Sequence, residues 1–455
     1  MFVGREKEIR QIQSLIHSEG KSAALIYGKR RIGKSTLIQN ALSDYHGHIV
    51  SYECLNASYE ENLVYFESRI REEYDNRYLH FSSFQDAFAY LSQTKENVVV
   101  VLDEYSYLKM SKPQHYVDSV FQSIIDSMGN NIHLFLLGSY VGVMQESLEE
   151  ENPLFGRFQL VIHLKELNYY ACAGFYSEKD VRGKIELYSV FGGNPFVNVL
   201  IDPKKDLKDN VISLLLNENS AVRTYLENVL LNELSKTGPA NLILTSLSNG
   251  KKKYSEISAQ TRINTAGVLD KQLKNLIRMD ILERRVPINR SDDRKKVFYE
   301  IGDNLVRFYY SYIFTGRDVI RRIGEEAYYD LYIQPSITTF ISYRFEDIAR
   351  QYFERQVREG KRNNIYDIGT YWYDDAQNHQ NGEFDCVLKH KSTYSFYEVK
   401  YYEAPLDRLL CEKEEEQVRK LAGEFDVETI GFISLNGFSF RTEKYDLICA
   451  KTMSE

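Results

Sequence analysis

No disulfide pattern, long hydrophobic run or basic excess marks this sequence of 455 residues. It has only five cysteines and no C-x-x-C pair, which argues against a disulfide scaffold or a zinc finger. Its longest aliphatic stretch is Val98–Leu102, far below the ~20 residues that span a bilayer. The first residues are too polar for a signal peptide, so we expect a cytoplasmic protein with no membrane partner.

The charge balance argues against a protein whose whole surface coats nucleic acid. The chain has 57 Lys and Arg against 65 Asp and Glu, a net charge of −8, which argues against wholesale coating of nucleic acid by a basic surface. It has only 8 prolines, so domain boundaries must be inferred from pattern. The length alone predicts about three domains.

Short apolar runs alternate with helical patterns in the first third of the chain. Four of these runs are typical of buried parallel strands: Ala23–Tyr27, Ile49–Tyr52, Val98–Leu102 and His133–Leu137. Alternation of this kind predicts an α/β domain with a parallel sheet.

The sharpest motif is Gly28-Lys29-Arg30-Arg31-Ile32-Gly33-Lys34-Ser35, which fits G-x-x-x-x-G-K-[ST]. It follows the first predicted strand and precedes a predicted helix, Ser35–Leu42. In such a loop the backbone N–H groups and the helix N-terminus bind phosphates. We therefore predict that residues 28–36, through Thr36, bind ATP, with Lys34 on the β and γ phosphates and Ser35 on Mg²⁺.

An acidic pair ends the strand Val98–Leu102. A phosphate-binding loop of this type needs such a partner on a neighbouring strand. We predict that Asp103 holds Mg²⁺ and that Glu104 activates the attacking water. The adjacent carboxylates favour hydrolysis over a kinase or a simple switch.

Four further segments resemble those of the archaeal-type ATPases, an AAA+-related group of prokaryotic P-loop ATPases close to the STAND group. They are Phe2-Val3-Gly4-Arg5-Glu6-Lys7-Glu8, His133–Tyr140, Asn152–Arg157 and Gly192-Gly193-Asn194-Pro195. In this family the first segment lies beside the adenine and the last belongs to a helical lid. The resemblance covers residues 1–205 and implies that Arg5 lies in the nucleotide site.

The same resemblance implies two more catalytic residues. Ser139 ends a strand similar to the family's sensor strand, which implies a position near the γ-phosphate. Arg157 ends a segment similar to P-L-x-G-R, which makes it a candidate arginine finger. Such fingers usually act on a neighbour's γ-phosphate, so the resemblance predicts an ATP-dependent homo-oligomer. A contact within one chain, or a surface arginine, is the alternative.

The middle of the chain has the pattern of a winged helix-turn-helix. The predicted elements are helices at Asn241–Ser248, from Tyr254, and at Ala266–Met279 with Asn264-Thr265 as its cap, then strands at Ile281–Val286 and Lys296–Ile301 around a turn at Asn289–Asp293. Residues 251–300 hold 13 Lys and Arg against 7 Asp and Glu, a local excess that predicts DNA contact. The alternative is a module that packs between an ATPase and its effector.

The C-terminal part combines acidic residues with a lysine. Asp385 lies in the strand-like run Phe384–Lys389, and Glu398 and Lys400 lie on one face of the next run, Ser395–Lys400. Two carboxylates and a lysine at a sheet edge predict a Mg²⁺ or Mn²⁺ site in which the lysine steers or deprotonates water.

This D-x(n)-E-x-K pattern resembles the PD-(D/E)XK nucleases over about residues 340–435. Glu346, on the predicted helix Ile341–Arg358, matches the extra acidic residue that this fold often supplies. The resemblance implies metal-dependent cleavage of DNA. A third predicted strand is Thr429–Leu435, and Glu412–Glu416 is interpreted as a solvated helix face.

The sequence thus predicts a multi-domain α/β protein. Its predicted parts are a P-loop parallel-sheet ATPase core at 1–165, a helical lid at 166–210, a winged helix-turn-helix at 211–310, a helical connector at 311–340 and a restriction-endonuclease-like α/β domain at 341–455. The function predicted is ATP hydrolysis coupled to DNA binding and cleavage. The alternative is a nucleotide-dependent signalling switch whose C-terminal domain binds DNA or a partner without cutting.

Overall fold

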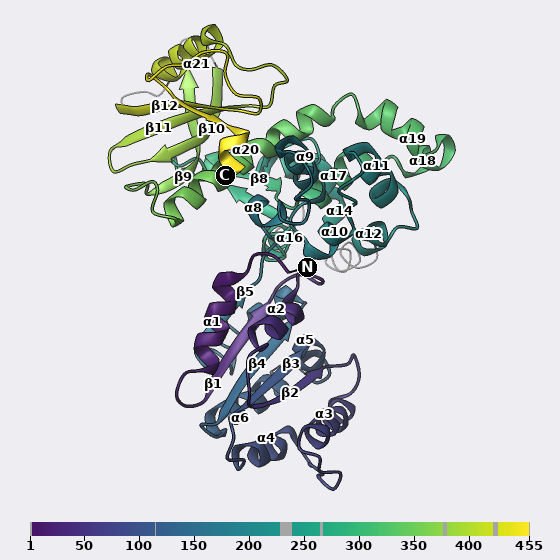
Figure 1. The fold of residues 1–455 in the computed structure, drawn as a ribbon. Coiled ribbons are helices and arrows are strands. Elements are labelled where there is room, and N and C mark those ends of the chain that lie inside the picture. Colours follow the sequence, from purple (N-terminus) through teal and green to yellow (C-terminus); the bar gives the residue numbers. More distant parts are fainter. Residues whose placement is uncertain are drawn as a thin grey trace. The chain divides into compact units, whose positions relative to one another are not determined.

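The computed structural model describes residues 2–113, 115–227, 239–263, 267–375, 380–421 and 426–454. They divide into two compact units, Phe2–Glu166 and Leu167–Glu455 (Figure 1). The first unit ends one residue after the boundary predicted at 165. The second unit, from Leu167 onward, contains the ranges predicted at 166–210, 211–310, 311–340 and 341–455. The three predicted boundaries between these ranges therefore fall inside one compact unit.

A five-stranded, all-parallel sheet forms the centre of the first unit, in the order β2-β3-β4-β1-β5. Its strands are β1 (Ser22–Tyr27), β2 (His48–Glu53), β3 (Val98–Asp103), β4 (Ile132–Gly138) and β5 (Leu160–His163). The first four are the predicted strands. β5 was not predicted, because it is short and three of its four residues are only partly buried or exposed.

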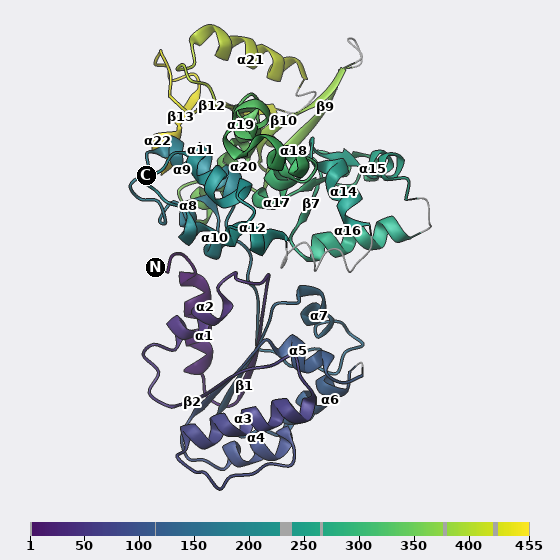
Figure 2. The same cartoon turned by 90° about the vertical axis from the view of Figure 1, so that its right-hand side faces the viewer.

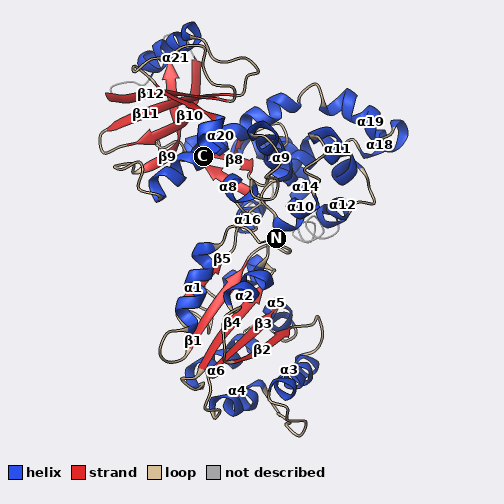
Figure 3. Ribbon diagram, viewed as in Figure 1, coloured by secondary structure: helices blue, strands red, loops and turns tan. Residues whose placement is uncertain are grey.

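Helices cover both faces of this sheet (Figures 2 and 3). They are α1 (Glu6–Ile16), α2 (Lys34–Ala41), α3 (Tyr59–Glu73), α4 (Phe84–Ser92), α5 (Tyr105–Met110), α6 (Tyr116–Ser127) and α7 (Val141–Glu146). Alternate strand residues face different cores: Ile26 and Leu137 pack with α1 and α2, whereas Leu25 and Leu136 pack with the other helices. The predicted α/β class is confirmed for this unit.

The second unit begins with short helices. They are α8 (Tyr169–Cys172), α9 (Val181–Phe191), α10 (Pro195–Leu200), α11 (Leu207–Val211), η1 (Ile212–Leu216) and α12 (Ala221–Thr224). The predicted lid motif lies between α9 and α10, where the Asn194 side chain caps α10.

A small three-helix, three-stranded group follows. Its elements are α14 (Ala240–Leu247), β6 (Lys252–Lys253), α15 (Tyr254–Thr261), α16 (Val268–Arg278), β7 (Leu282–Arg285), the single turn η3 (Arg294–Lys296) and β8 (Phe298–Ile301). The strands are antiparallel in the order β6-β8-β7. The predicted cap Asn264-Thr265 lies outside the described residues.

Helical segments connect this group to the C-terminal sheet. They are α17 (Asn304–Phe308), η4 (Tyr309–Ile313), α18 (Arg317–Ile323), α19 (Glu325–Tyr328), η5 (Tyr329–Ile333) and α20 (Ile337–Arg358). The last begins four residues before the predicted start at 341. Among the described residues, no helix is both long enough and apolar enough to cross a membrane.

A second five-stranded sheet, in the order β13-β12-β11-β10-β9, ends the chain. Its elements are β9 (Asp367–Asp375), β10 (Gln380–Lys389), β11 (Thr393–Lys400), α21 (Arg408–Leu421), β12 (Asp426–Ser434), β13 (Asp446–Cys449) and α22 (Ala450–Ser454). β9, β10 and β11 are antiparallel neighbours, whereas β12 runs parallel to β11. β9 and β13 were not predicted, because neither contains a long apolar run.

Helices α20 and α21 cover opposite faces of this second sheet. Phe396 packs in a core that includes Cys411 and Val418 of α21. The next residue, Tyr397, contacts Phe353 of α20, with ring centres 4.4 Å apart. Because side chains alternate along a strand, each residue of β11 can be assigned to one helix or the other.

The loop between β7 and β8 packs on the outer edge of β9. Ile288 lies in the core of the C-terminal sheet and donates a backbone hydrogen bond to Thr370 (2.8 Å). The Asn289 side chain both donates to and accepts from the backbone of Trp372 (2.8 and 2.9 Å). A Cβ at Gly369 would lie 2.7 Å from Ile288, so this close approach requires glycine.

Candidate functional sites

The phosphate-binding loop has the backbone that its sequence predicts. Gly33 precedes α2 with φ 94°, and Arg31 has φ 61°, so the loop curls through two left-handed positions. A Cβ at Gly28 would lie 2.2 Å from the carbonyl oxygen of Leu164. Gly33 is therefore required by its left-handed φ angle, and Gly28 is required because a side chain would collide with Leu164.

Three predicted residues meet at the carboxyl edge of the parallel sheet. The Lys34 ammonium group donates to Ser139 Oγ (2.8 Å), and to the carbonyl oxygens of Gly28 and Lys29 (3.1 and 3.2 Å). Ser139 in turn donates to the carboxylate of Glu104. Lys34 and Ser139 are 5% and 3% exposed, so the network is sheltered from bulk water.

The predicted magnesium ligands also face each other. Ser35 Oγ donates to Asp103 Oδ2, and Asp103 Oδ1 accepts from the backbone N–H of Glu104 (2.8 Å). Glu104 has φ 51°, a left-handed conformation that is costly for a residue with a side chain and is often found at functional sites. Its Oε2 is buried and has no hydrogen-bond partner among the described residues. This oxygen donor set fits Mg²⁺ with a nucleotide phosphate and leaves one acceptor for a water.

The remaining predicted nucleotide-binding residues are spread around the loop. Lys29 is buried and pairs with Glu166 (3.3 Å), and Ile32 packs in the core beside α1 and α2. Thr36 is exposed on α2. Arg5 donates to the carbonyl oxygen of Lys165 (2.5 Å). Direct nucleotide contact by these side chains stays a prediction.

Arg30 occupies a distinct environment in the same loop. Its Nη2 atom donates to the hydroxyl groups of Tyr107 (2.6 Å) and Tyr140 (2.8 Å). Burial raises the pKa of Tyr107, Arg30 opposes that rise, and the nearby Glu104 carboxylate adds to it. Sequence reasoning gave Arg30 no role beyond membership of the loop.

The candidate arginine finger, Arg157, lies at the other edge of the sheet. Its guanidinium group pairs with both carboxylate oxygens of Asp126, at the end of α6 (3.0 Å each). The backbone of Asp126 accepts from Lys21, directly before β1 begins, whereas the phosphate-binding loop follows the end of β1. Arg157 is therefore paired with Asp126 rather than with a residue of the phosphate-binding loop, and the alternatives of a contact within one chain or a surface arginine stay open. A role on a neighbouring molecule stays a prediction.

In the second unit, Asp385 and Glu346 line one cavity of about 750 Å³, together with Arg344, Arg350 and Lys251. Burial raises the pKa of Asp385, and three nearby cations, Lys251 first, partly oppose the rise. Burial, and then the neighbouring Asp385 carboxylate, raise the pKa of Glu346 well above its usual range. Two carboxylates that share one buried site cannot both ionise easily.

Glu398 and Lys400 lie on the other face of this sheet. Lys400 pairs with Glu398 (2.6 Å) and with Glu414 of α21 (3.3 Å). Burial lowers the pKa of Lys400, but Glu398 outweighs it and raises the pKa. The interpretation of Glu412–Glu416 as a solvated face was therefore wrong at Glu414, and also at Glu415, which binds Lys444 and Tyr445.

No group of three or more metal-ligating side chains could hold an ion in the part of the chain that the structure describes. The β9–β10 pairing shifts register between Phe384 and Val387, and Asp385 lines the cavity with Glu346 of α20. Glu398 instead contacts Lys400, which also pairs with Glu414 of α21. The Asp385 carboxylate is still near enough to raise the pKa of Glu398. The site of two carboxylates and a lysine, with Glu346 as an extra acidic residue, therefore stays a prediction.

A buried cluster of charges joins the three-stranded group to the C-terminal sheet. Glu300 pairs with Arg285, with Arg307 (3.2 Å) and with Arg344 (3.6 Å). Asp347 of α20 binds Arg285 (2.6 Å) as well. Burial alone would raise the pKa of Glu300, but the arginines outweigh it and lower the pKa to about 2.

This cluster corrects the expectation that the basic residues of 251–300 together form a face for DNA. Arg285 is held by carboxylates, and Lys251 pairs with Glu383 of β10. Lys296 lies 3.8 Å from the ring centre of Trp372. Lys271 and Lys274, on α16, are exposed. Exposed basic residues remain on α16 and also in the β7–β8 loop, at Arg290 and Lys295, so contact with DNA stays a prediction.

Two family models match separate parts of the chain. Residues 2–199 match a family described as an ATPase domain predominantly from Archaea, and residues 309–418 match archaeal and bacterial proteins of unknown function. An uncharacterized protein of Methanocaldococcus jannaschii is 26% identical over 411 residues, which is 88% of each chain.

Two solved structures match part of this chain. A Walker-type ATPase of Pyrococcus abyssi has a TM-score of 0.51 and 20% identity, over 68% of this chain and 96% of that one. The ORC2 protein of Aeropyrum pernix has a TM-score of 0.45 and 13% identity, over 68% and 92%. Together with the loop geometry, the family match shows that the N-terminal part of the chain is a P-loop ATPase domain.

Proposed function

We propose that this protein is an ATP-hydrolysing regulator whose nucleotide state controls the activity of its second unit. The observation that carries the proposal is the chain of contacts from Lys34 through Ser139 to Glu104. A base, a cation and a polar relay at the end of two neighbouring strands are what hydrolysis of a γ-phosphate requires.

The residues have separate chemical roles. Lys34 neutralises charge on the β and γ phosphates, and backbone N–H groups of the loop bind the phosphate oxygens. Ser35 and Asp103 would hold Mg²⁺, which would supply positive charge to the phosphates. Glu104 accepts a proton from the attacking water through its unpartnered Oε2.

The test is ATP binding and turnover in three proteins. Lys34→Ala should lose ATP binding, because the cation on the phosphates is gone. Glu104→Gln should bind ATP but hydrolyse it roughly 10²–10⁴ times more slowly, the usual contribution of a general base. An unchanged turnover in Glu104→Gln would remove that residue as the base.

The second unit is proposed to bind DNA through α16. The order α14, β6, α15, α16, β7, β8 supports a winged helix, because two strands follow the third helix and pair as a hairpin. The exposed Lys271 and Lys274 supply the charge that attracts a phosphate backbone. ATP-dependent self-association also remains part of this proposal.

DNA cleavage is kept as a second candidate, because of the order of the C-terminal elements. A helix, three antiparallel strands, a second helix and a parallel strand support a nuclease-like domain. The split of Asp385 from Glu398 instead favours the alternative, a domain that binds without cutting.

Incubating plasmid with Mg²⁺ or Mn²⁺, with and without ATP, decides between these candidates. Cleavage that disappears in both Asp385→Ala and Lys400→Ala, while ATP hydrolysis persists, would establish the nuclease. Intact plasmid with the wild type, alongside measurable DNA binding, would establish the regulator that does not cut.

A further inference from the structure

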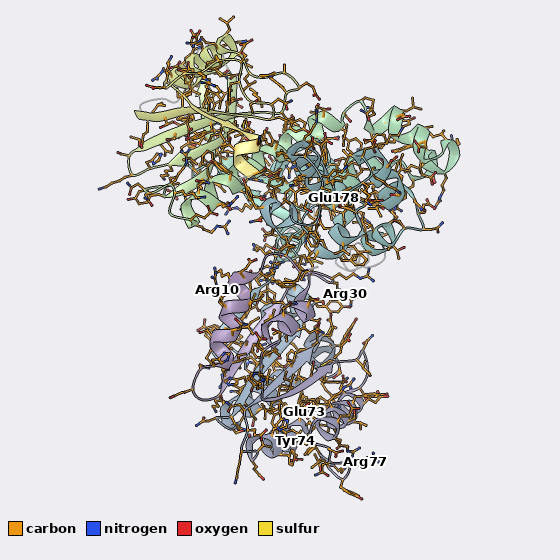
Figure 4. The ribbon with its side chains drawn as sticks, viewed as in Figure 1. Arg10, Arg30, Glu73, Tyr74, Arg77 and Glu178 are labelled. Carbon is orange, nitrogen blue, oxygen red and sulfur yellow. The ribbon has the colours of Figure 1, made fainter. Side chains whose placement is uncertain are left out.

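Arg30 is the residue of the phosphate-binding loop that contacts two tyrosines. The residue is third in the phosphate-binding loop, and its guanidinium carbon is 4.9 Å from the ring centre of Tyr140 and 5.8 Å from that of Tyr107. Figure 4 shows Arg30 toward the end of the first unit that is opposite to Tyr74 of α3. The guanidinium group is held there by the hydroxyl groups of Tyr107 and Tyr140.

The two tyrosines locate this guanidinium group relative to the catalytic network. Tyr140 directly follows Ser139, the partner of Lys34, and Tyr107 lies three residues beyond Glu104 on α5. Both tyrosines therefore belong to the strand ends that carry the base and the relay. The guanidinium group of Arg30 thus lies beside the elements that carry Glu104 and Ser139.

We infer that Arg30 contacts the γ-phosphate of ATP bound by its own chain, and that Tyr107 and Tyr140 hold its guanidinium group while that phosphate is absent. This inference rests on the proposed ATPase function and adds a catalytic residue to it. Anionic phosphate oxygens bind a guanidinium group more strongly than neutral hydroxyl groups do, because hydrogen bonds between charged groups are about twice as strong. No covalent bond forms or breaks at Arg30.

Contact between Arg30 and the γ-phosphate would supply the cation that ATP hydrolysis needs there, and Arg157 is paired with Asp126 instead. Negative charge spreads over the three γ-phosphate oxygens in the transition state, and an arginine there accelerates hydrolysis. The planar fork of Arg30 can bind two of these oxygens at once, which a lysine cannot do. A cation supplied by the same chain makes hydrolysis independent of a neighbouring molecule.

The experiment compares Arg30→Gln and Arg30→Lys with Arg10→Gln, which removes an exposed arginine from α1. Affinities for ADP and for a non-hydrolysable ATP analogue, and turnover at several protein concentrations, are measured. Arg30→Gln should keep ADP affinity, lose the preference for the ATP analogue and lower kcat on the order of 10²–10³-fold. Arg30→Lys should recover part of both losses, and wild-type kcat should not depend on protein concentration.

A double variant, Tyr107→Phe with Tyr140→Phe, separates this role from a structural one. If Arg30 only supports the tyrosines, the double variant should lose as much turnover as Arg30→Gln, and the inference fails. An unchanged analogue-over-ADP ratio in Arg30→Gln also overturns it. A wild type that hydrolyses no ATP contradicts the proposed function instead, and the affinity ratio still decides the contact made by Arg30.

Discussion

Lys34 and Glu104 contact the same hydroxyl group, that of Ser139. Lys34 donates a hydrogen bond to the Ser139 oxygen, and the Ser139 hydroxyl donates one to the Glu104 carboxylate. The three side chains are therefore aligned before a nucleotide binds. A γ-phosphate that recruits Lys34 competes with Ser139 for this ammonium group. Ser139 stays bound to one oxygen of Glu104, and the other oxygen, Oε2, is the one that accepts a proton from water.

The first prediction concerns this relay. Ser139→Ala should bind ATP, because Lys34 and the loop remain, but should lower kcat at least about tenfold, or about 1.4 kcal/mol in the barrier. Steady-state kinetics with ATP gives kcat and KM separately. A raised KM with an unchanged kcat would show that Ser139 serves binding alone.

The second prediction concerns Arg157. Its ion pair with Asp126 leads us to expect that Arg157→Ala lowers the thermal stability of the first unit while ATP turnover persists. Turnover and molecular mass are measured with ATP over a range of protein concentrations. Loss of turnover, together with a wild-type rate that rises with concentration, would instead support an arginine finger acting on a neighbouring molecule.

The third prediction separates α16 from the β7–β8 loop in DNA binding. Charge reversal at Lys271 and Lys274 should weaken binding and make the dependence of log affinity on log salt shallower, by roughly 0.9 for each phosphate that the protein no longer neutralises. Charge reversal at Arg290 and Lys295, two exposed residues of the β7–β8 loop, is a matched control because it changes the net charge by the same amount. Equal effects in the two proteins would mean that only the net charge matters.

The fourth prediction concerns the buried charges around Glu300. Glu300→Gln leaves its arginines uncompensated and should lower the free energy of unfolding by about 3–5 kcal/mol near neutral pH. The pKa of Glu300 is lowered to about 2, so its contribution is complete above the unfolded value near 4.5 and is lost as pH falls toward 2. Denaturant unfolding of both proteins from pH 7 to pH 3 should show the difference shrinking below about pH 5. A difference that stays constant would contradict this ionic origin.

Local signals predicted the first unit well. The strand before Gly28, the glycine at Gly33 and the helix that begins at Lys34 follow from short-range sequence rules, since each depends on residues a few positions away. Asp103 and Ser139 are separated widely in sequence. They nevertheless meet the loop, because the ends of parallel strands share one edge of the sheet.

The second unit was harder to predict, for a physical reason. Whether Asp385 faces α20 or α21 depends on one extra residue in a ladder with β9, a strand whose apolar pattern is weak. The burial of Glu415 could have been predicted from the sequence, because Cys411, Glu415 and Val418 fall on one helical face. The pairing of Arg285 with Asp347 joins residues 62 positions apart and has no local signal.

The contact between Asn289 and Trp372 has a consequence for the behaviour of the protein in concentrated solution. An outer strand with unpaired backbone groups is a template on which other chains can add strands and aggregate. Ile288 and Asn289 occupy those backbone groups at Thr370 and Trp372, so this stretch of β9 offers no open template. A loop whose pattern suggested contact with DNA thereby keeps the C-terminal sheet from polymerising through that edge.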